Sequence, residues 1–249
     1  MNIKNKLKSI FGINLIETID VGRSNEKVRK QWIEKTLKSI PEGSKILDAG
    51  AGQQQYKKFC AHLNYVSQDF AEYNPKELMT GLQKTKWDYG SLDVVSDIAS
   101  IPCDDNSFDV LMCTEVLEHV VNPREAIKEF SRLLKIEGLL ILTAPFCSLT
   151  HFAPYHFYSG FNSFFYKTEL EANNFEILEI IANGNYFDYL AQEINRLPKI
   201  SKQYSDVNLS PSVVNNLNKL KKTLKSLSQK DTNSSELLCY GYHVLAKKK

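Results

Sequence analysis

The feature that most constrains the fold of this chain is the stretch from Lys45 to Gln53, which reads Lys-Ile-Leu-Asp-Ala-Gly-Ala-Gly-Gln. A short apolar run ends in an acid and is followed by two glycines one residue apart, the pattern of a buried parallel strand that turns into a helix beneath a bound ligand. Gly50 can adopt a positive φ for the tight turn, and Gly52 lets the backbone approach a ligand because it has no Cβ atom. We therefore predict an α/β fold with a ligand site at this loop.

The residues around the two glycines narrow the class of ligand. A dinucleotide-binding loop needs a third glycine where Gln55 stands, and a phosphate-binding loop needs Gly-Lys-Ser/Thr, which is absent here. Asp48 places a carboxylate before the glycines, where it would repel a pyrophosphate and attract an ammonium or sulfonium group. A nucleotide-dependent oxidoreductase is therefore the weaker interpretation.

Hydrophobic patterning predicts strands that alternate with helices, and hence right-handed βαβ units around a mostly parallel sheet. The expected strands cover residues 45–49, 65–68, 92–96, 108–113, 139–143, 175–181 and 237–245. We expect residues 1–44 to form an N-terminal helical segment and residues 45–249 to form one domain, with a helical insertion at about 186–235. The polar stretch 76–90 shows no period and is expected to be irregular.

Capping and helix-breaking residues indicate where the expected helices begin and end. Ser24 is expected to cap a helix over 25–39, and a second helix is expected after the glycine loop, through Tyr56 and Leu63. A third helix is expected to start at Pro123 and to be closed by Gly138.

Composition excludes several classes of protein. The formal net charge of the 249 residues is +2, with no basic stripe interleaved with aromatics, so a nucleic-acid partner is not expected. The five cysteines include no Cys-x-x-Cys pair and are typical of reduced thiols in a cytoplasmic protein. No apolar run approaches the length of a transmembrane span, and no signal peptide is expected.

Three acids stand at the carboxyl ends of the first three expected strands: Asp48, Asp69 and Asp97. Ligands of open parallel sheets bind at these ends. A carboxylate at Asp69 can accept both hydroxyls of a ribose, and one at Asp97 can accept from an adenine amino group, with the Ile98 backbone in reach of the ring. A single aspartate at a strand end is usually only a turn residue, but three in register behind a Gly-x-Gly loop indicate a nucleoside site.

The pattern Asp-x-Gly-x-Gly resembles motif I of the class I S-adenosylmethionine (SAM) dependent methyltransferases, and the following segment resembles the type 11-like members. The residues that carry this second resemblance are Asp97, Ile101, Pro102, Phe108, Asp109, Glu115, Val116, Leu117, Glu118, His119, Pro123, Glu129, Arg132, Leu134, Gly138 and Pro145. Glu137 departs from the usual Gly-Gly turn.

The resemblance implies a three-layer αβα sandwich, Rossmann-like, with a seven-stranded, mostly parallel sheet whose last strand is antiparallel. It implies SAM as cofactor and S-adenosylhomocysteine as product. The cofactor-binding residues that it implies are Asp48, Ala49, Gly50, Gly52, Asp69, Phe70, Asp97, Ile98 and Thr114.

The candidate catalytic residues lie in the segment Thr150–Tyr158, after the expected fifth strand. His151, His156 and Tyr155 could wall an acceptor pocket, and either histidine could serve as general base. The competing interpretation is that the aromatics belong to the core and the histidines are hydrogen-bonding spacers.

Glu115, Glu118 and His119 have the i, i+3, i+4 spacing that would place them on one helix face, and they resemble the metal site of quinone-biosynthesis O-methyltransferases. The same letters occur in methyltransferases that use no metal. We therefore expect no metal and keep Mg²⁺ at these residues as the alternative.

The predicted function is transfer of a methyl group from SAM to a small-molecule or saccharide acceptor, at oxygen, by in-line displacement. The tetrad typical of base-amino methylases is replaced by Thr114-Glu115-Val116-Leu117. The resemblance leans toward cell-surface polysaccharide biosynthesis, and a homodimer is compatible with it. The alternative is a non-catalytic SAM-binding regulatory or scaffold protein.

Overall fold

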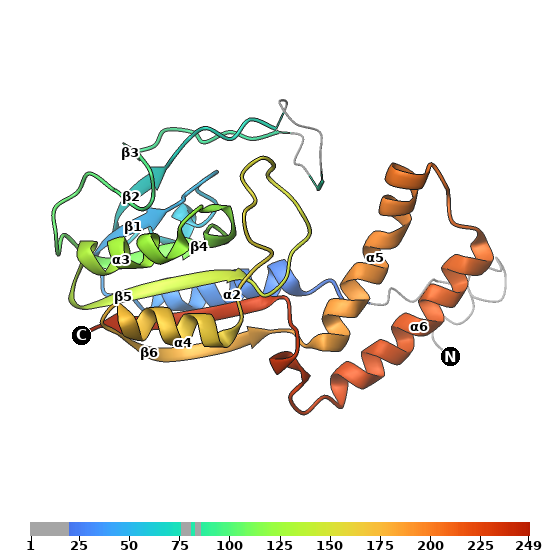
Figure 1. The fold of residues 1–249 in the computed structure, drawn as a ribbon. Helices are drawn as coiled ribbons and strands as arrows, with labels where there is room; N and C mark the ends of the chain where they lie inside the picture. Colours follow the sequence, from blue (N-terminus) through green and yellow to red (C-terminus); the bar gives the residue numbers. More distant parts are fainter. Residues whose placement is uncertain (1–19, 76–80, 83–85) are drawn as a thin grey trace, which may run out of the picture.

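The computed structural model describes residues 20–75, 81–82 and 86–249, and these form a seven-stranded sheet with helices on both faces (Figure 1). The strand order is β3-β2-β1-β4-β5-β7-β6. The order of the strands reverses at β1, because β2 and β4 lie on its two sides and all three run parallel, and this is where open α/β sheets bind their ligands.

The first five strands pair in parallel. They are β1 (Lys45–Ala49), β2 (Asn64–Asp69), β3 (Val94–Val95), β4 (Phe108–Thr114) and β5 (Leu134–Pro145). Ile46, Leu47, Leu111 and Met112 are fully buried, as continuous apolar runs are when helices cover both faces of a parallel sheet.

The sheet ends in β6 (Phe175–Asn183) and β7 (Gly241–Lys248). β7 inserts between β5 and β6 and is antiparallel to both. The predicted seven-stranded sheet with an antiparallel last strand is therefore confirmed.

Helices form the two outer layers, as predicted. On one face α2 (Asn25–Lys38) buries Ile33 and Leu37 against Ile46 and Met112 of the sheet. On the other face α3 (Pro123–Leu133) and α4 (Ser163–Ala172) cover the sheet.

The prediction of an α-helix after the glycine loop is wrong. Residues 53–56 form turns, and only the short 3₁₀ helix η1 (Lys57–Phe59) follows. Gln54 has φ 53°, in the left-handed region, so an α-helix cannot run on from the second glycine. The capping role predicted for Ser24 is also wrong, because its helical backbone (φ −89°, ψ −10°) is not that of a capping residue and its side chain makes no cap hydrogen bond.

The predicted end of the third helix and the predicted length of the third strand both need correction. Gly138 does not close α3, because β5 begins directly at Leu134 and the register shifts around residues 135–138, where Glu137 has φ 64°. β3 is only two residues long, since the Asp93 carboxylate, rather than backbone, accepts from the Ser67 N–H (2.8 Å).

Two long helices, α5 (Tyr186–Ser205) and α6 (Pro211–Gln229), connect β6 to β7. They pack on each other and extend away from the sheet as an arm (Figure 1). α5 continues through Pro198, and the 3₁₀ helix η3 (Ser234–Glu236) leads back to β7, which starts at Gly241 and not at Leu237 as predicted.

Candidate active site

A cavity of about 1020 Å³ opens at the carboxyl ends of β1, β2 and β4. The predicted residues Gly50, Gly52, Asp69, Phe70, Asp97, Ile98, Thr114, His151 and Tyr155 all line it. Three others, Asp48, Ala49 and His156, do not line it.

The glycine loop is held against β2 by backbone hydrogen bonds. The N–H groups of Gly50 and Ala51 donate to the Gln68 carbonyl at 2.9 and 2.8 Å. Gly50 has φ 74°, and a Cβ atom there would come within 2.5 Å of Val116. Both the turn and its packing therefore require glycine.

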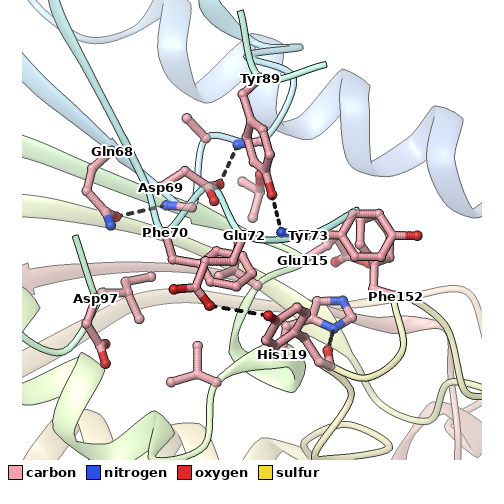
Figure 2. A pocket seen from close by; sticks show the side chains of 18 of the residues that line it. Gln68, Asp69, Phe70, Glu72, Tyr73, Tyr89, Asp97, Glu115, His119 and Phe152 are labelled. Carbon is pink, nitrogen blue, oxygen red and sulfur yellow. Dashed lines mark hydrogen bonds between the residues drawn. The ribbon is translucent and has the colours of Figure 1, made fainter. Parts of the chain in front are cut away.

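Asp69 fixes the second glycine. Its carboxylate accepts from the Gly52 N–H at 2.8 Å and from the Ala71 N–H at 3.1 Å (Figure 2). Burial raises the pKa of the Asp69 carboxyl, and these backbone donors oppose the shift. Asp97 closes its own turn by accepting from the Ala99 N–H at 2.8 Å, and it faces the same cavity.

Asp48 lies beneath the glycine loop, 2% exposed, and accepts a hydrogen bond from the Tyr65 hydroxyl at 2.6 Å. Burial raises the pKa of its carboxyl to about 7, the Tyr65 bond opposes this, and nearby Asp69 adds to it. The side chain thus contacts the core rather than the cavity.

The sequence interpretation missed Arg29 of α2, which lines the cavity beside the glycine loop. Its guanidinium donates to Glu115 Oε2 at 2.9 Å, and its buried Nε has no hydrogen-bond partner among the described residues. No sequence signal marks this arginine, because only the packing of α2 on the sheet brings it to the site.

The helix face predicted for Glu115, Glu118 and His119 does not form. Glu115 has φ 55° and only Leu117–His119 form a 3₁₀ turn, η2. Glu115 therefore points to Arg29 and also accepts from the Thr143 hydroxyl at 3.1 Å. Glu118 and His119 instead meet His151, which comes from the loop after β5.

We call His119, His151 and Tyr155, which line the cavity, together with the buried Glu118 beside them, the histidine side. Glu118 is fully buried, and burial raises the pKa of its carboxyl well above the usual range. Burial, and next the neighbouring His151, lower the pKa of His119 to about 3. His156 bonds Ser148 Oγ through Nε2 at 3.1 Å, outside the cavity lining.

Aromatic rings wall the space between the glycine loop and the histidine side (Figure 2). Tyr73 packs against Trp87 and Phe152, with ring centroids 5.6 and 4.5 Å apart, and Phe70 packs edge-on against Tyr155. The Tyr155 hydroxyl donates to Glu72 at 3.2 Å. Such a wall suits a flat or cationic ligand.

Comparison with known proteins agrees with this geometry. Residues 47–142 match the model of the methyltransferase domain family. The demethylmenaquinone methyltransferase of Clavibacter sepedonicus is 31% identical over 115 residues, 45% of this chain and 46% of the relative. The ubiquinone biosynthesis O-methyltransferase of Glaesserella parasuis is 48% identical over 40 residues, 16% of this chain and 17% of the relative.

The fold has solved counterparts. A SAM dependent methyltransferase from Archaeoglobus fulgidus superposes with a TM-score of 0.53 at 18% identity, covering 99% of this chain and 100% of that one. The match over residues 47–142 and the shared fold agree with the methyltransferase motifs of the sequence. The matched region spans about half the length of the demethylmenaquinone methyltransferase relatives.

Among the described residues, no helix is long and apolar enough to cross a membrane.

Proposed function

We propose that this protein transfers the methyl group of SAM to an oxygen of a small-molecule acceptor. The observation that carries the proposal is one cavity with two unlike sides. On one side lie Gly50, Gly52 and the acids of the nucleoside site, and on the other lies the histidine side, where Glu118 is buried without a hydrogen bond among the described residues.

In this proposal, the Gly50–Gly52 turn and Asp69 hold the cofactor, with Asp69 toward the ribose and Asp97 toward the adenine. Arg29 contacts the carboxylate of the methionine part, which supplies the acceptor that its buried Nε lacks. The predicted contacts of Asp48 and Ala49 become indirect, because both support the loop from below.

The reaction is an in-line displacement at the methyl carbon. The acceptor oxygen forms the new bond, the electron pair of the broken bond stays on sulfur, and S-adenosylhomocysteine leaves. Alignment against the aromatic wall supplies most of the acceleration, roughly 7–11 kcal/mol for a well-oriented pair. A hydroxyl acceptor must also lose its proton, and His151 is the predicted catalytic residue best placed to act on that oxygen.

The aromatic residues that wall the cavity indicate the chemical class of the acceptor. Tyr73, Phe152 and Tyr155 favour a flat, hydroxyl-bearing ring, which agrees with the quinone-pathway names of the two sequence relatives. A saccharide, which also stacks on aromatic faces, is the second acceptor class to screen. We place the protein in the cytoplasm, where SAM is available.

Calorimetric titration with SAM and S-adenosylhomocysteine tests the cofactor site. Asp69→Ala should weaken binding at least about tenfold, because charge-assisted hydrogen bonds contribute roughly 1.5–3 kcal/mol. Asp104→Ala, which removes an exposed acid away from the cavity, should bind as wild type does. A folded wild type that binds neither ligand would overturn the proposal.

Product formation in the presence of hydroxylated aromatics or sugars then tests catalysis. Tight SAM binding without turnover on either acceptor class would favour the non-catalytic SAM-binding alternative.

A further inference from the structure

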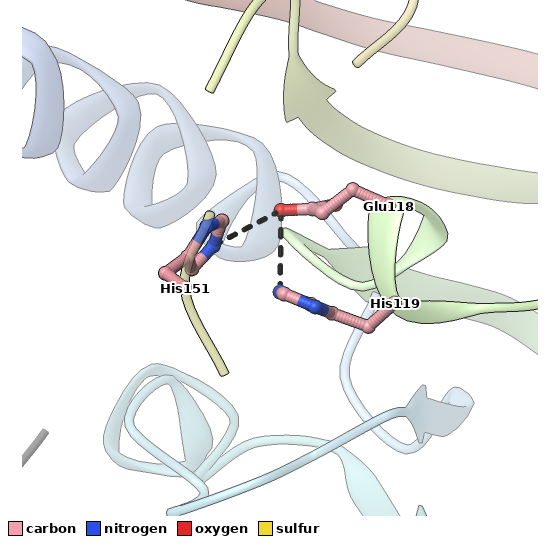
Figure 3. A group of neighbouring side chains, drawn as sticks. All are labelled: Glu118, His119 and His151. Carbon is pink, nitrogen blue, oxygen red and sulfur yellow. Dashed lines mark ion pairs between the residues drawn. The ribbon is translucent and has the colours of Figure 1, made fainter. Parts of the chain in front are cut away.

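Three ligand atoms converge on one point at the floor of the histidine side (Figure 3). Glu118 Oε1 lies 3.6 Å from His119 Nε2 and 3.9 Å from His151 Nε2, and all three atoms lie within 4.8 Å of one another. The two histidines come from segments about 30 residues apart, η2 and the loop after β5.

The hydrogen bonds of the two rings fix their protons. His119 Nδ1 lies 2.5 Å from the Tyr155 carbonyl, and His151 Nδ1 lies 2.8 Å from the Leu149 carbonyl. A carbonyl only accepts, so in each neutral ring Nδ1 carries the proton and Nε2 presents a lone pair. The Nε2 atoms of both rings therefore lie on the side of Glu118 Oε1.

No donor from the described part of the chain compensates Glu118. It is fully buried, and neither carboxylate oxygen has a hydrogen-bond partner among the described residues. The guanidinium of Arg29, whose charge acts on Glu118, bonds Glu115 instead. Burial of a carboxyl without a donor disfavours its ionised form, and a cation held between this carboxyl and the two Nε2 atoms would stabilise that form.

We propose that Glu118, His119 and His151 bind a divalent transition-metal ion of the zinc class. Two imidazole nitrogens and one carboxylate oxygen suit Zn²⁺, whereas Mg²⁺ prefers an all-oxygen shell. Tetrahedral ligands about 2.0–2.1 Å from zinc stand roughly 3.3 Å apart, so the three side chains would have to move inward to close the shell.

The surroundings match those of zinc sites that keep one open position. The carbonyls of Tyr155 and Leu149 orient the two rings from behind, as outer-shell acceptors do for metal-bound histidines. His119 and His151 both line the cavity, so the fourth position faces the space proposed for the acceptor oxygen. With zinc bound, His151 would act on that oxygen through the ion rather than as a base.

This ligand set differs from the helix-face set of Glu115, Glu118 and His119. The carboxylate of Glu115 is already engaged by Arg29 and Thr143, and His151 takes the third place. The proposal is independent of methyl transfer, since metal binding can be measured without SAM.

The test is zinc titration of untagged, chelator-treated full-length protein, with the bound metal counted by mass spectrometry. Wild type should bind one Zn²⁺ with micromolar affinity or tighter, and Co²⁺ in its place should give the intense visible bands of a tetrahedral site. His151→Ala should weaken binding at least about 100-fold, as expected when one of three protein ligands is lost.

The matched controls are Glu115→Gln and His156→Ala, which should bind zinc as wild type does. His151 is partly exposed, so its replacement should leave the fold intact, which near-ultraviolet circular dichroism checks. Absence of zinc binding by folded wild type, or loss of binding in Glu115→Gln but not in His151→Ala, would overturn the assignment. Titration of the same samples with SAM tests the proposed cofactor site independently of zinc binding.

Discussion

The two sides of the cavity are built on opposite principles. On the glycine-loop side the strand ends supply donors and acceptors in matched pairs, such as the Gly52 N–H with Asp69. On the histidine side the carboxyl of Glu118 is buried without a hydrogen bond among the described residues. The first side is preorganised for a constant ligand, whereas the second holds a buried carboxyl that the proposed zinc ion would satisfy.

The difference follows from the elements that carry each side. Asp69 and the glycines follow directly from β1 and β2, whose positions the sheet register fixes. His151 and Tyr155 lie on the loop between β5 and α4, whose course depends on side-chain contacts such as Phe152 with Tyr73. Loops on a rigid scaffold commonly carry the specific chemistry of an enzyme.

The largest effect should come from Gly50→Ala. The new Cβ would meet Val116 at 2.5 Å in a left-handed backbone, so the free energy of unfolding should fall by about 2–5 kcal/mol and SAM binding should be lost. Gly43→Ala is the matched control, because Gly43 has φ 79° but nothing within 4 Å of its Cβ position. It should cost only the backbone strain, about 1–2 kcal/mol, and retain SAM binding. Equal losses in denaturant unfolding would show that Val116 packing does not matter.

Asp48→Asn should remove a pH dependence of stability. The pKa of Asp48 is raised by burial from 3.8 to about 7, so the folded state binds the proton more tightly than the unfolded state. Stability is therefore highest at low pH with respect to this group and falls as pH rises toward 7, by about 3 kcal/mol between pH 5 and 8. Urea unfolding across this range should show the decline in wild type and a flatter profile in the variant. Parallel profiles for the two proteins would contradict the assignment.

The same contrast separates what sequence reasoning predicts from what it does not. The strands and the acids at their ends follow from apolar runs and glycines, which act locally, and β1, β2 and β4 appear close to their predicted bounds. The helix after Gly52 fails because one residue, Gln54, adopts a left-handed backbone that no pattern marks. Arg29 and the pairing of Glu118 with His151 arise only from tertiary packing, so spacing along the chain pointed to Glu115 instead.

His151→Ala should separate the two sides functionally. Turnover with a hydroxyl acceptor should fall at least about 100-fold, whether His151 acts as base or as metal ligand. The Kd for SAM should stay within about twofold of wild type, because the glycine loop and Asp69 remain. His156→Ala should change both quantities little, since this ring bonds Ser148 outside the cavity lining. Initial rates and calorimetry on the same preparations measure the split, and an equal loss of SAM affinity would contradict the division into two sides.

Tyr155→Phe should have the smallest effect, although the sequence places Tyr155 among the candidate catalytic residues. Its hydroxyl already donates to Glu72 at 3.2 Å near solvent, while its carbonyl orients His119. Only the hydroxyl is lost in the variant, so turnover should fall no more than a few fold, and the free energy of unfolding should change by less than about 1 kcal/mol. A fall in turnover as large as that of His151→Ala, at unchanged stability, would instead make the Tyr155 hydroxyl a catalytic group. The Tyr155 hydroxyl, on the aromatic wall, would then contribute to catalysis as much as the imidazole of His151.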